Sequence, residues 1–122
     1  MHRTLILAAT LMALASALPA HAVLTETENR FFDAYDAGEN AFAKAVAASR
    51  DRDLAAACEA FPQAEDAFVE SLALLDLLVA EAKQDTTLTD QGRGQKLRDL
   101  DYLKGEISED VQVIRDARKN CA

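Results

Sequence analysis

Apolar residues recur with a helical period along most of the chain after residue 22. Thr25-Glu26-Thr27-Glu28 has the S/T-x-x-E form of a capping box, which predicts a helix start at Thr25. Downstream, apolar and small residues share one narrow stripe at about 3.6 residues per turn: Leu24, Phe31, Tyr35, Gly38, Phe42, Ala45, Val46 and Ser49. The polar residues 50–53 follow, so we expect the first helix to end there and the next to be capped there.

Two further helical segments follow, over residues 53–83 and from about residue 95 to about Asn120. The first has a broad apolar face: Ala64, Phe68, Leu72, Leu74, Leu75, Leu78, Val79 and Ala82. Pro62 interrupts it, and because proline disrupts a helix interior, we expect a kink or a break near Phe61, with residues 53–61 as a possible separate helix. Residues 84–94, rich in Thr, Asp and Gly, are the predicted long connection.

These segments predict an all-α fold, an up-down-up bundle of three helices with one disulfide between Cys58 and Cys121. The midpoint of the two cysteines falls inside the predicted loop, at 89.5. The same mirror sets apolar residues opposite each other: Phe68 and Val111, Leu72 and Ile107, Val79 and Leu100, Ala82 and Leu97. A second mirror, near Asp51, brings Tyr35 close to Phe68. A redox pair or an intermolecular link is the alternative for the cysteines, but redox pairs are usually spaced C-x-x-C.

The N-terminus indicates export. Met1-His2-Arg3 precedes an apolar run of about 14 residues that ends in Pro19-Ala20-His21-Ala22, the pattern of a secretory signal peptide. We expect cleavage after residue 22, which leaves residues 23–122 as a single helical domain. The run is shorter than the roughly 20 residues that span a bilayer, so no membrane insertion is expected after cleavage. An ordinary N-terminal helix is the alternative, but this segment has no polar face. Cysteine usage also favours a periplasmic or secreted protein.

Composition narrows the chemistry. Residues 23–122 keep all 21 acidic residues and lose Arg3 from the 13 basic ones, giving a net charge of −9. Such a charge disfavours nucleic acid and anionic membranes as partners. Both histidines, His2 and His21, lie in the predicted signal peptide, so we expect no catalytic histidine, no His-ligated metal, no haem and no other cofactor. We therefore expect no enzyme; a hydrolase with paired carboxylates is a remote alternative.

Several apolar residues lie outside the predicted core stripes. Phe32, Val69, Leu77, Tyr102 and Val113 are in this group, and the last four form a possible contact surface. A rotation of the second helix at Pro62 would instead turn Val69 and Leu77 inward. Asp76 stands within Leu72–Val79 at the margin of the apolar face. It either pairs with Lys83 at the surface or is half-buried with a raised pKa.

One short resemblance bears on function. The segment Leu88-Thr89-Asp90-Gln91 is similar to the LTxxQ motif of periplasmic stress chaperones, with the glutamine one position early. The pattern as a whole favours a non-enzymatic interaction protein of the cell envelope, whose partner is another envelope or extracellular protein. The alternative is a stress chaperone of the holdase type, which the resemblance implies. The oligomeric state is left open by these patterns.

Overall fold

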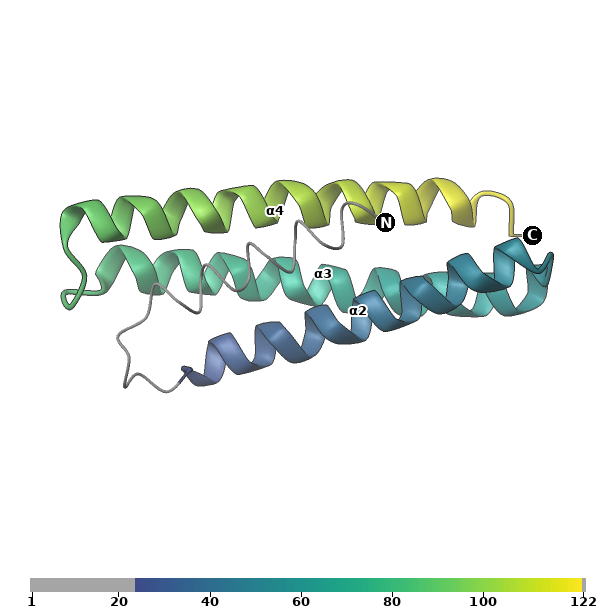
Figure 1. The fold of residues 1–122 in the computed structure, drawn as a ribbon, viewed down its shortest axis with the longest axis horizontal. Helices are drawn as coiled ribbons and strands as arrows, with labels where there is room; N and C mark the ends of the chain where they lie inside the picture. Colours follow the sequence, from purple (N-terminus) through teal and green to yellow (C-terminus); the bar gives the residue numbers. More distant parts are fainter. Residues whose placement is uncertain (1–23, 122) are drawn as a thin grey trace.

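Three helices make up residues 24–121, the part of the chain that the structure, a computed structural model, describes. They are α2 (Glu26–Arg50), α3 (Leu54–Gln84) and α4 (Asp90–Arg118), in an up-down-up arrangement without any strand in this part of the chain (Figure 1). The predicted all-α three-helix fold is confirmed. The predicted signal peptide, residues 1–22, lies outside the described residues.

The central helix of the bundle is α3. It packs along both α2 and α4, which lie on either side of it, with α2 inclined to the other two (Figure 1). No Cα atom of α2 comes within 8 Å of a Cα atom of α4. Helices in direct ridge-into-groove contact have axes about 8–10 Å apart, which brings backbones closer than this. Side chains alone therefore bridge α2 and α4.

Each helix begins at a residue whose side chain accepts a backbone hydrogen bond. Thr25 forms the predicted capping box: its hydroxyl accepts from the Glu28 amide at 3.1 Å, and its own amide donates to the Glu28 carboxylate at 3.2 Å. Asp53 accepts from the Ala56 amide before α3. Thr89 accepts from the Gly92 amide before α4. These caps satisfy amides that a helix start otherwise leaves without partners.

The turn between α2 and α3 is a Schellman motif. The Asp53 amide donates to the Ala48 carbonyl at 2.9 Å, and the Arg52 amide donates to the Ser49 carbonyl at 3.2 Å. This motif requires a left-handed residue after the C-cap, and Arg52 occupies it with φ of 58°. Since glycine is the usual residue here, the chain accepts a strain of about 1–2 kcal/mol at this position.

Small residues dominate where α2 meets α3. Gly38 lies against the ring of Phe68, so closely that a Cβ atom at residue 38 would be 2.6 Å from Phe68 Cδ1. The predicted approach of Tyr35 to Phe68 is confirmed, with ring centroids 6.0 Å apart. Alanines fill much of the remaining buried surface of the two helices: Ala34, Ala41, Ala45, Ala57, Ala60, Ala64 and Ala82.

Branched side chains and covalent or ionic links join α3 to α4. The predicted Cys58–Cys121 disulfide is present, with a Cα–Cα distance of 5.8 Å. Asp76 pairs with Lys104 at 3.1 Å and Glu65 with Arg115 at 3.4 Å, and the midpoint of each pair is residue 90. The predicted register of these two helices is therefore confirmed. The buried core of α4 consists of Leu100, Leu103, Ile107, Val111 and Ile114.

The predicted break at Pro62 is wrong, because α3 is a single helix from Leu54 to Gln84 with Pro62 inside it. Proline at this position leaves the Cys58 carbonyl without its helical donor, at a cost of about 3 kcal/mol. Pro62 lies two turns before the exposed Val69 and therefore on the same, outer side of α3. Phe61 and Ala64, both buried, hold the helix on the core side.

The predicted connection over residues 84–94 is too long. The loop is short, because Thr89 caps α4 and the helix already begins at Asp90. Gly92 and Gly94, which suggested a loop, have ordinary negative φ angles within the first two turns of α4. The capping hydroxyl of Thr89 is the stronger local signal, since it supplies an acceptor to an amide of the first turn.

Candidate functional site

A line of buried and half-buried side chains runs along one side of α2. Its members recur at intervals of three or four residues and so share one face of the helix: Glu28, Phe32, Tyr35, Glu39, Phe42 and Val46. On α4, residues at intervals of three or four share one face as well: Asp99, Tyr102, Glu106, Asp110 and Val113. We call the two lines together the α2–α4 seam, the candidate site of this protein.

An aromatic cluster forms the part of the seam near the start of α2. The rings of Phe31 and Phe32 meet edge to face at 5.7 Å, and Phe31 stacks on Tyr35 at 6.0 Å. A small cavity of about 20 Å³ lies beside them, lined by Glu28, Phe31, Phe32, Leu78, Lys96 and Leu100. The lining comes from all three helices, which shows that Glu28 and Phe32 face α4.

A polar group lies deeper in the seam. Tyr35 is 4% exposed, and its buried hydroxyl has no hydrogen bond of good geometry within the described part of the chain. Burial, followed by the negative charge of Glu39, raises the pKa of Tyr35 far above its usual value, and Asp110 on α4 adds to the effect. Burial also raises the pKa of Glu39, although interaction with the Tyr35 hydroxyl opposes that change. The seam therefore holds acidic groups that the fold shields from water.

The α4 side of the seam carries two of the predicted surface residues, Tyr102 and Val113. Each comes two residues before a side chain that pairs with α3, namely Lys104 and Arg115. Positions two residues apart are roughly 160° apart around a helix, so both side chains point away from α3. They are 45% and 46% exposed. Between them, Glu106 and Asp110 follow Tyr102 at steps of one turn toward the side facing Tyr35.

The other two predicted surface residues lie on α3. Val69 and Leu77 are both exposed, one turn either side of Ala73 on the outer face of this helix. Because Tyr102 and Val113 point away from α3, the four residues belong to two separate faces. Their role in contacts stays a prediction. Phe32, the fifth residue of that group, is different, since it packs against the core and is only partly exposed.

The buried-carboxylate interpretation of Asp76 is wrong. Its side chain is 64% exposed and forms its ion pair with Lys104 of α4, not with Lys83. The periodicity of a single helix indicates only partners on that same helix, such as Lys83. The helix register places residue 104 at the same height as residue 76, so the cross-helix lysine is available without bending the side chain back along α3.

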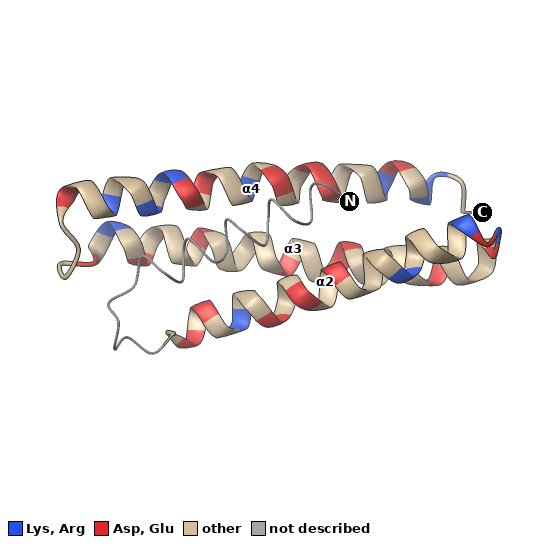
Figure 2. Ribbon diagram, in the orientation of Figure 1, with Lys and Arg blue, Asp and Glu red and all other residues tan. Residues whose placement is uncertain are grey.

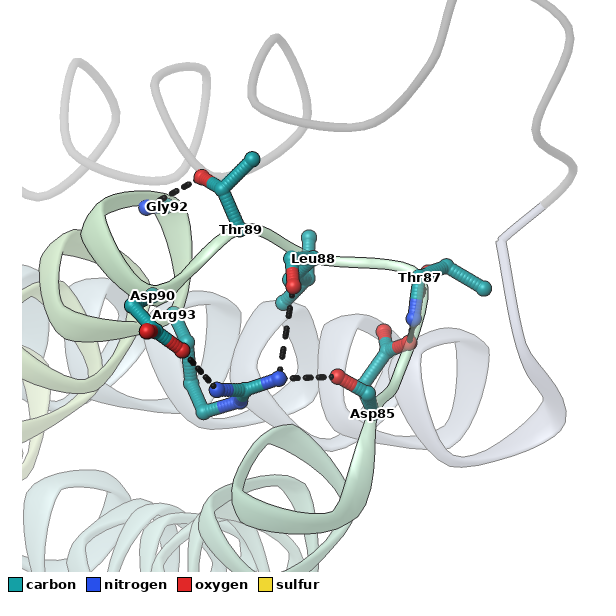
Figure 3. Close-up of polar contacts among 7 residues, drawn as sticks. All are labelled: Asp85, Thr87, Leu88, Thr89, Asp90, Gly92 and Arg93. Carbon is teal, nitrogen blue, oxygen red and sulfur yellow. Dashed lines mark hydrogen bonds and ion pairs between the residues drawn. The ribbon is translucent and has the colours of Figure 1, made fainter.

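Arg93 organises the loop between α3 and α4 (Figure 3). Its guanidinium group donates to the Asp85 carbonyl at 2.7 Å and to the Leu88 carbonyl at 3.3 Å, and it pairs with Asp90 at 3.1 Å. In this loop Leu88 and Thr89, the residues that resemble the chaperone motif, precede and cap α4. Their local role is thus the start of a helix.

The polar group at Tyr35, Glu39 and Asp110 was not predicted from the sequence. One signal was available: Asp110 occupies a position of the core stripe, between Ile107 and Ile114, where a carboxylate is unusual. Elsewhere the described residues offer little other chemistry. Among residues 24–121, no group of three or more His, Cys, Asp or Glu side chains is placed to hold a metal ion.

None of the helices of residues 24–121 is long and apolar enough to cross a membrane. The disulfide indicates an oxidising compartment outside the cytoplasm. Comparison of the chain with protein-family models, with curated proteins and with solved structures finds no match.

Proposed function

We propose that the chain is an exported, non-enzymatic binding protein of the cell envelope or its exterior. The observation that carries this proposal is the number of large apolar side chains left at the surface of a small, otherwise well-packed bundle. Val69, Leu77, Tyr102 and Val113 are each 42–51% exposed, and Leu54 is 62% exposed. Apolar side chains that recur along one helix face are typical of contact surfaces.

Site-specific crosslinking tests the binding function directly. A photo-crosslinking amino acid replaces Tyr102, Leu77 or, as a control, the exposed polar residue Ser108. After irradiation of producing cells, we expect one discrete adduct from at least one apolar position and none from position 108. The same diffuse set of adducts at all three positions, or none at all, would contradict a binding protein.

Mass spectrometry tests the export on which the proposal depends. We expect the exported chain to begin at Val23 and to be lighter by two hydrogens than its fully reduced form, since the disulfide removes two thiol hydrogens. The disulfide supports an oxidising compartment, and the signal-peptide pattern of residues 1–22 supports the periplasm or the exterior. Intact residues 1–22 in the extracellular or periplasmic fraction would contradict it.

A holdase-type stress chaperone is the second candidate. It is favoured by the distribution of exposed apolar residues over two faces, one on α3 and one on α4, which suits weak contacts with many clients. A holdase lowers the light scattering of a thermally unfolded client at substoichiometric amounts, whichever client is used. Protection of no unrelated client would remove this candidate and leave the first.

A further inference from the structure

An open hollow of about 380 Å³ at the C-terminal end of α4 gathers basic side chains. It is lined by Glu65 of α3 and by Arg115, Arg118 and Lys119 from the end of α4. We propose that this hollow binds the phosphate group of a phosphate monoester. The site uses none of the exposed apolar residues on which the proposed function rests, and it therefore goes beyond that function.

One carboxylate holds both arginines of the hollow. Glu65 Oε1 accepts a hydrogen bond from Arg118 Nη1 at 3.0 Å, and Glu65 Oε2 accepts one from Arg115 Nε at 3.4 Å. The Glu65 side chain is only 16% exposed, whereas the side chains of Arg115 and Arg118 are 55% and 41% exposed. The carboxylate is thus largely covered, while the two guanidinium groups are fixed in place and stay open to a ligand.

Most N–H donors of these arginines are available. A guanidinium group has five N–H donors in a planar fork. In the described part of the chain, Arg115 and Arg118 each donate to Glu65 and to no other side chain. Phosphate oxygens match such forks in a bidentate manner. Lys119 adds a third cation; it pairs with Asp116 at 3.3 Å, but both side chains are well exposed, so this pair exchanges readily with another partner.

The local charge favours a dianion over a carboxylate. The four lining residues carry three positive charges and one negative, whereas the whole chain has a net charge of −8. Acidic residues recur along all three helices, and basic residues mark the end of α4 and the turn between α2 and α3, at the same end of the bundle (Figure 2). A phosphate monoester carries about −1.5 to −2 charges at pH 7. Because the rest of the chain is acidic, a small ligand fits better than an extended polyanion.

Titration of the disulfide-bonded exported protein with inorganic phosphate tests the proposal. Nitrogen-15 NMR at constant ionic strength follows the backbone amides and the Nε–H groups of the arginines. We expect saturable shifts of the Nε–H signals of Arg115 and Arg118 and of the amides around them. Acetate, which has one negative charge and no tetrahedral set of oxygens, should bind about ten-fold more weakly.

Variants matched in net charge locate the site. We expect Arg118→Gln to weaken phosphate binding about ten-fold or more, because it removes a charged donor. Arg118→Lys keeps the charge but not the fork, and it should weaken binding several-fold. Lys44→Gln is the control, since it removes one charge from a second hollow, lined also by Ala56, Glu59, Ala60 and Gln63, and it should change binding less than about two-fold. Circular dichroism verifies that each variant is folded.

Glu65→Ala separates positioning from simple attraction. This variant makes the hollow more positive, so attraction by charge alone predicts tighter phosphate binding. If Glu65 instead fixes the two guanidinium groups, its loss leaves them free to move, and binding should weaken. We expect weaker binding, with the Nε–H signals of Arg115 and Arg118 moving toward those of a freely rotating arginine.

Vesicles distinguish the two sources of a phosphate monoester. Binding of inorganic phosphate without sedimentation on phosphatidic acid vesicles assigns the hollow to a small soluble ligand. Sedimentation that Arg118→Gln abolishes assigns it to a lipid headgroup. Three results would overturn the proposal: no saturable shift at the arginines with either probe, equal binding of acetate, or tighter binding by Glu65→Ala. In each case the arginines serve only to pair with Glu65.

Discussion

The two interfaces of α3 are built in different ways. Toward α2, the two helices approach closely, because Gly38 leaves room for the ring of Phe68 and alanines line both helices. A side-chain hydrogen bond from Thr27 to Glu81 joins the start of α2 to the end of α3. Toward α4, larger aliphatic side chains fill the core, and a disulfide and three ion pairs link the helices. The first interface depends on shape, so it is sensitive to a single methyl group. The second depends on links that can be removed one at a time.

Loss of the disulfide should produce the largest effect. In the chain-entropy treatment, a loop of 63 residues contributes about 4 kcal/mol to the free energy of unfolding. We expect Cys58→Ser to lower that free energy by about this amount, with most helical signal retained at room temperature. Urea denaturation monitored by circular dichroism measures it. Reduction of the natural protein is the control and should cost the same; identical midpoints with and without reductant would contradict the role of this bond.

Gly38→Ala tests the close approach at the α2 interface. Helix propensity alone would make alanine stabilising by about 0.5–1 kcal/mol. The new Cβ atom would lie 2.6 Å from a Phe68 ring carbon that is fully buried, and overpacking of this kind costs about 1–3 kcal/mol. We therefore expect a net loss of stability in thermal melts. A smaller side chain in place of the Phe68 ring should relieve this clash. Phe68→Leu should therefore lower the free energy of unfolding less in the Gly38→Ala background than on its own. A net gain in stability for Gly38→Ala would contradict the packing described.

The contributions of Glu65 and Glu39 to the free energy of unfolding should change with pH in opposite directions. Hydrogen bonds from Arg118, then Arg115, lower the pKa of Glu65 below 4.5, so its stabilising contribution is present above pH 4.5 and lost as the pH falls through the folded pKa. Glu65→Gln should cost about 1 kcal/mol or less at pH 7 and much less at pH 3. Chemical denaturation at both pH values measures this, with Asp76→Asn, an exposed pair, as the matched control.

For Glu39, burial raises the folded pKa above 4.5. Burial penalises the charged carboxylate more than the neutral carboxyl group, so the stability that this group contributes at low pH is lost as the pH rises through the folded pKa. We expect Glu39→Gln to raise the midpoint of unfolding at pH 7 and to leave it unchanged near pH 3. A lower midpoint at pH 7 would show that the charge of Glu39 is satisfied where it stands.

Gly105→Ala should produce the smallest effect and serves as the partner of Gly38→Ala. Gly105 is exposed within α4, and apart from its chain neighbours and the adjacent backbone of its own helix, no atom lies within 4 Å of where its Cβ would be. Nothing opposes the gain in helix propensity, so we expect a stabilisation of about 0.5–1 kcal/mol, measured by thermal melting. A loss of stability here would mean that glycine is needed in α4 for a reason other than packing.

Local and pairwise signals in the sequence predicted much of this bundle. The Thr25 capping box depends on four adjacent residues, and the α3–α4 register depends on the position of two cysteines and on apolar pairs mirrored about them. Predictions failed where one local rule competed with packing. Pro62 has a helix-breaking propensity, but buried side chains on both sides of it keep α3 continuous.

The candidate site was less predictable, because it depends on which side chains of different helices face one another. Tyr102 and Val113 were recognised as surplus apolar residues, but their separation from Val69 and Leu77 follows from ion pairs that periodicity does not reveal. Asp76 was assigned a partner on its own helix for the same reason. The shielded group at Tyr35, Glu39 and Asp110 combines α2 with α4, the two helices that are farthest apart in the sequence.

The Cys58–Cys121 bond closes a covalent ring that contains most of α3 and all of α4 but leaves α2 outside it. The C-terminal end of α2 is attached through the turn at residues 51–53, and its N-terminal half is held by packing and by the Thr27–Glu81 hydrogen bond. This helix can therefore detach from its first turn onward while the ring stays closed. In native-state hydrogen exchange, such an opening would release the amides of α2 at a lower free energy than those of the ring.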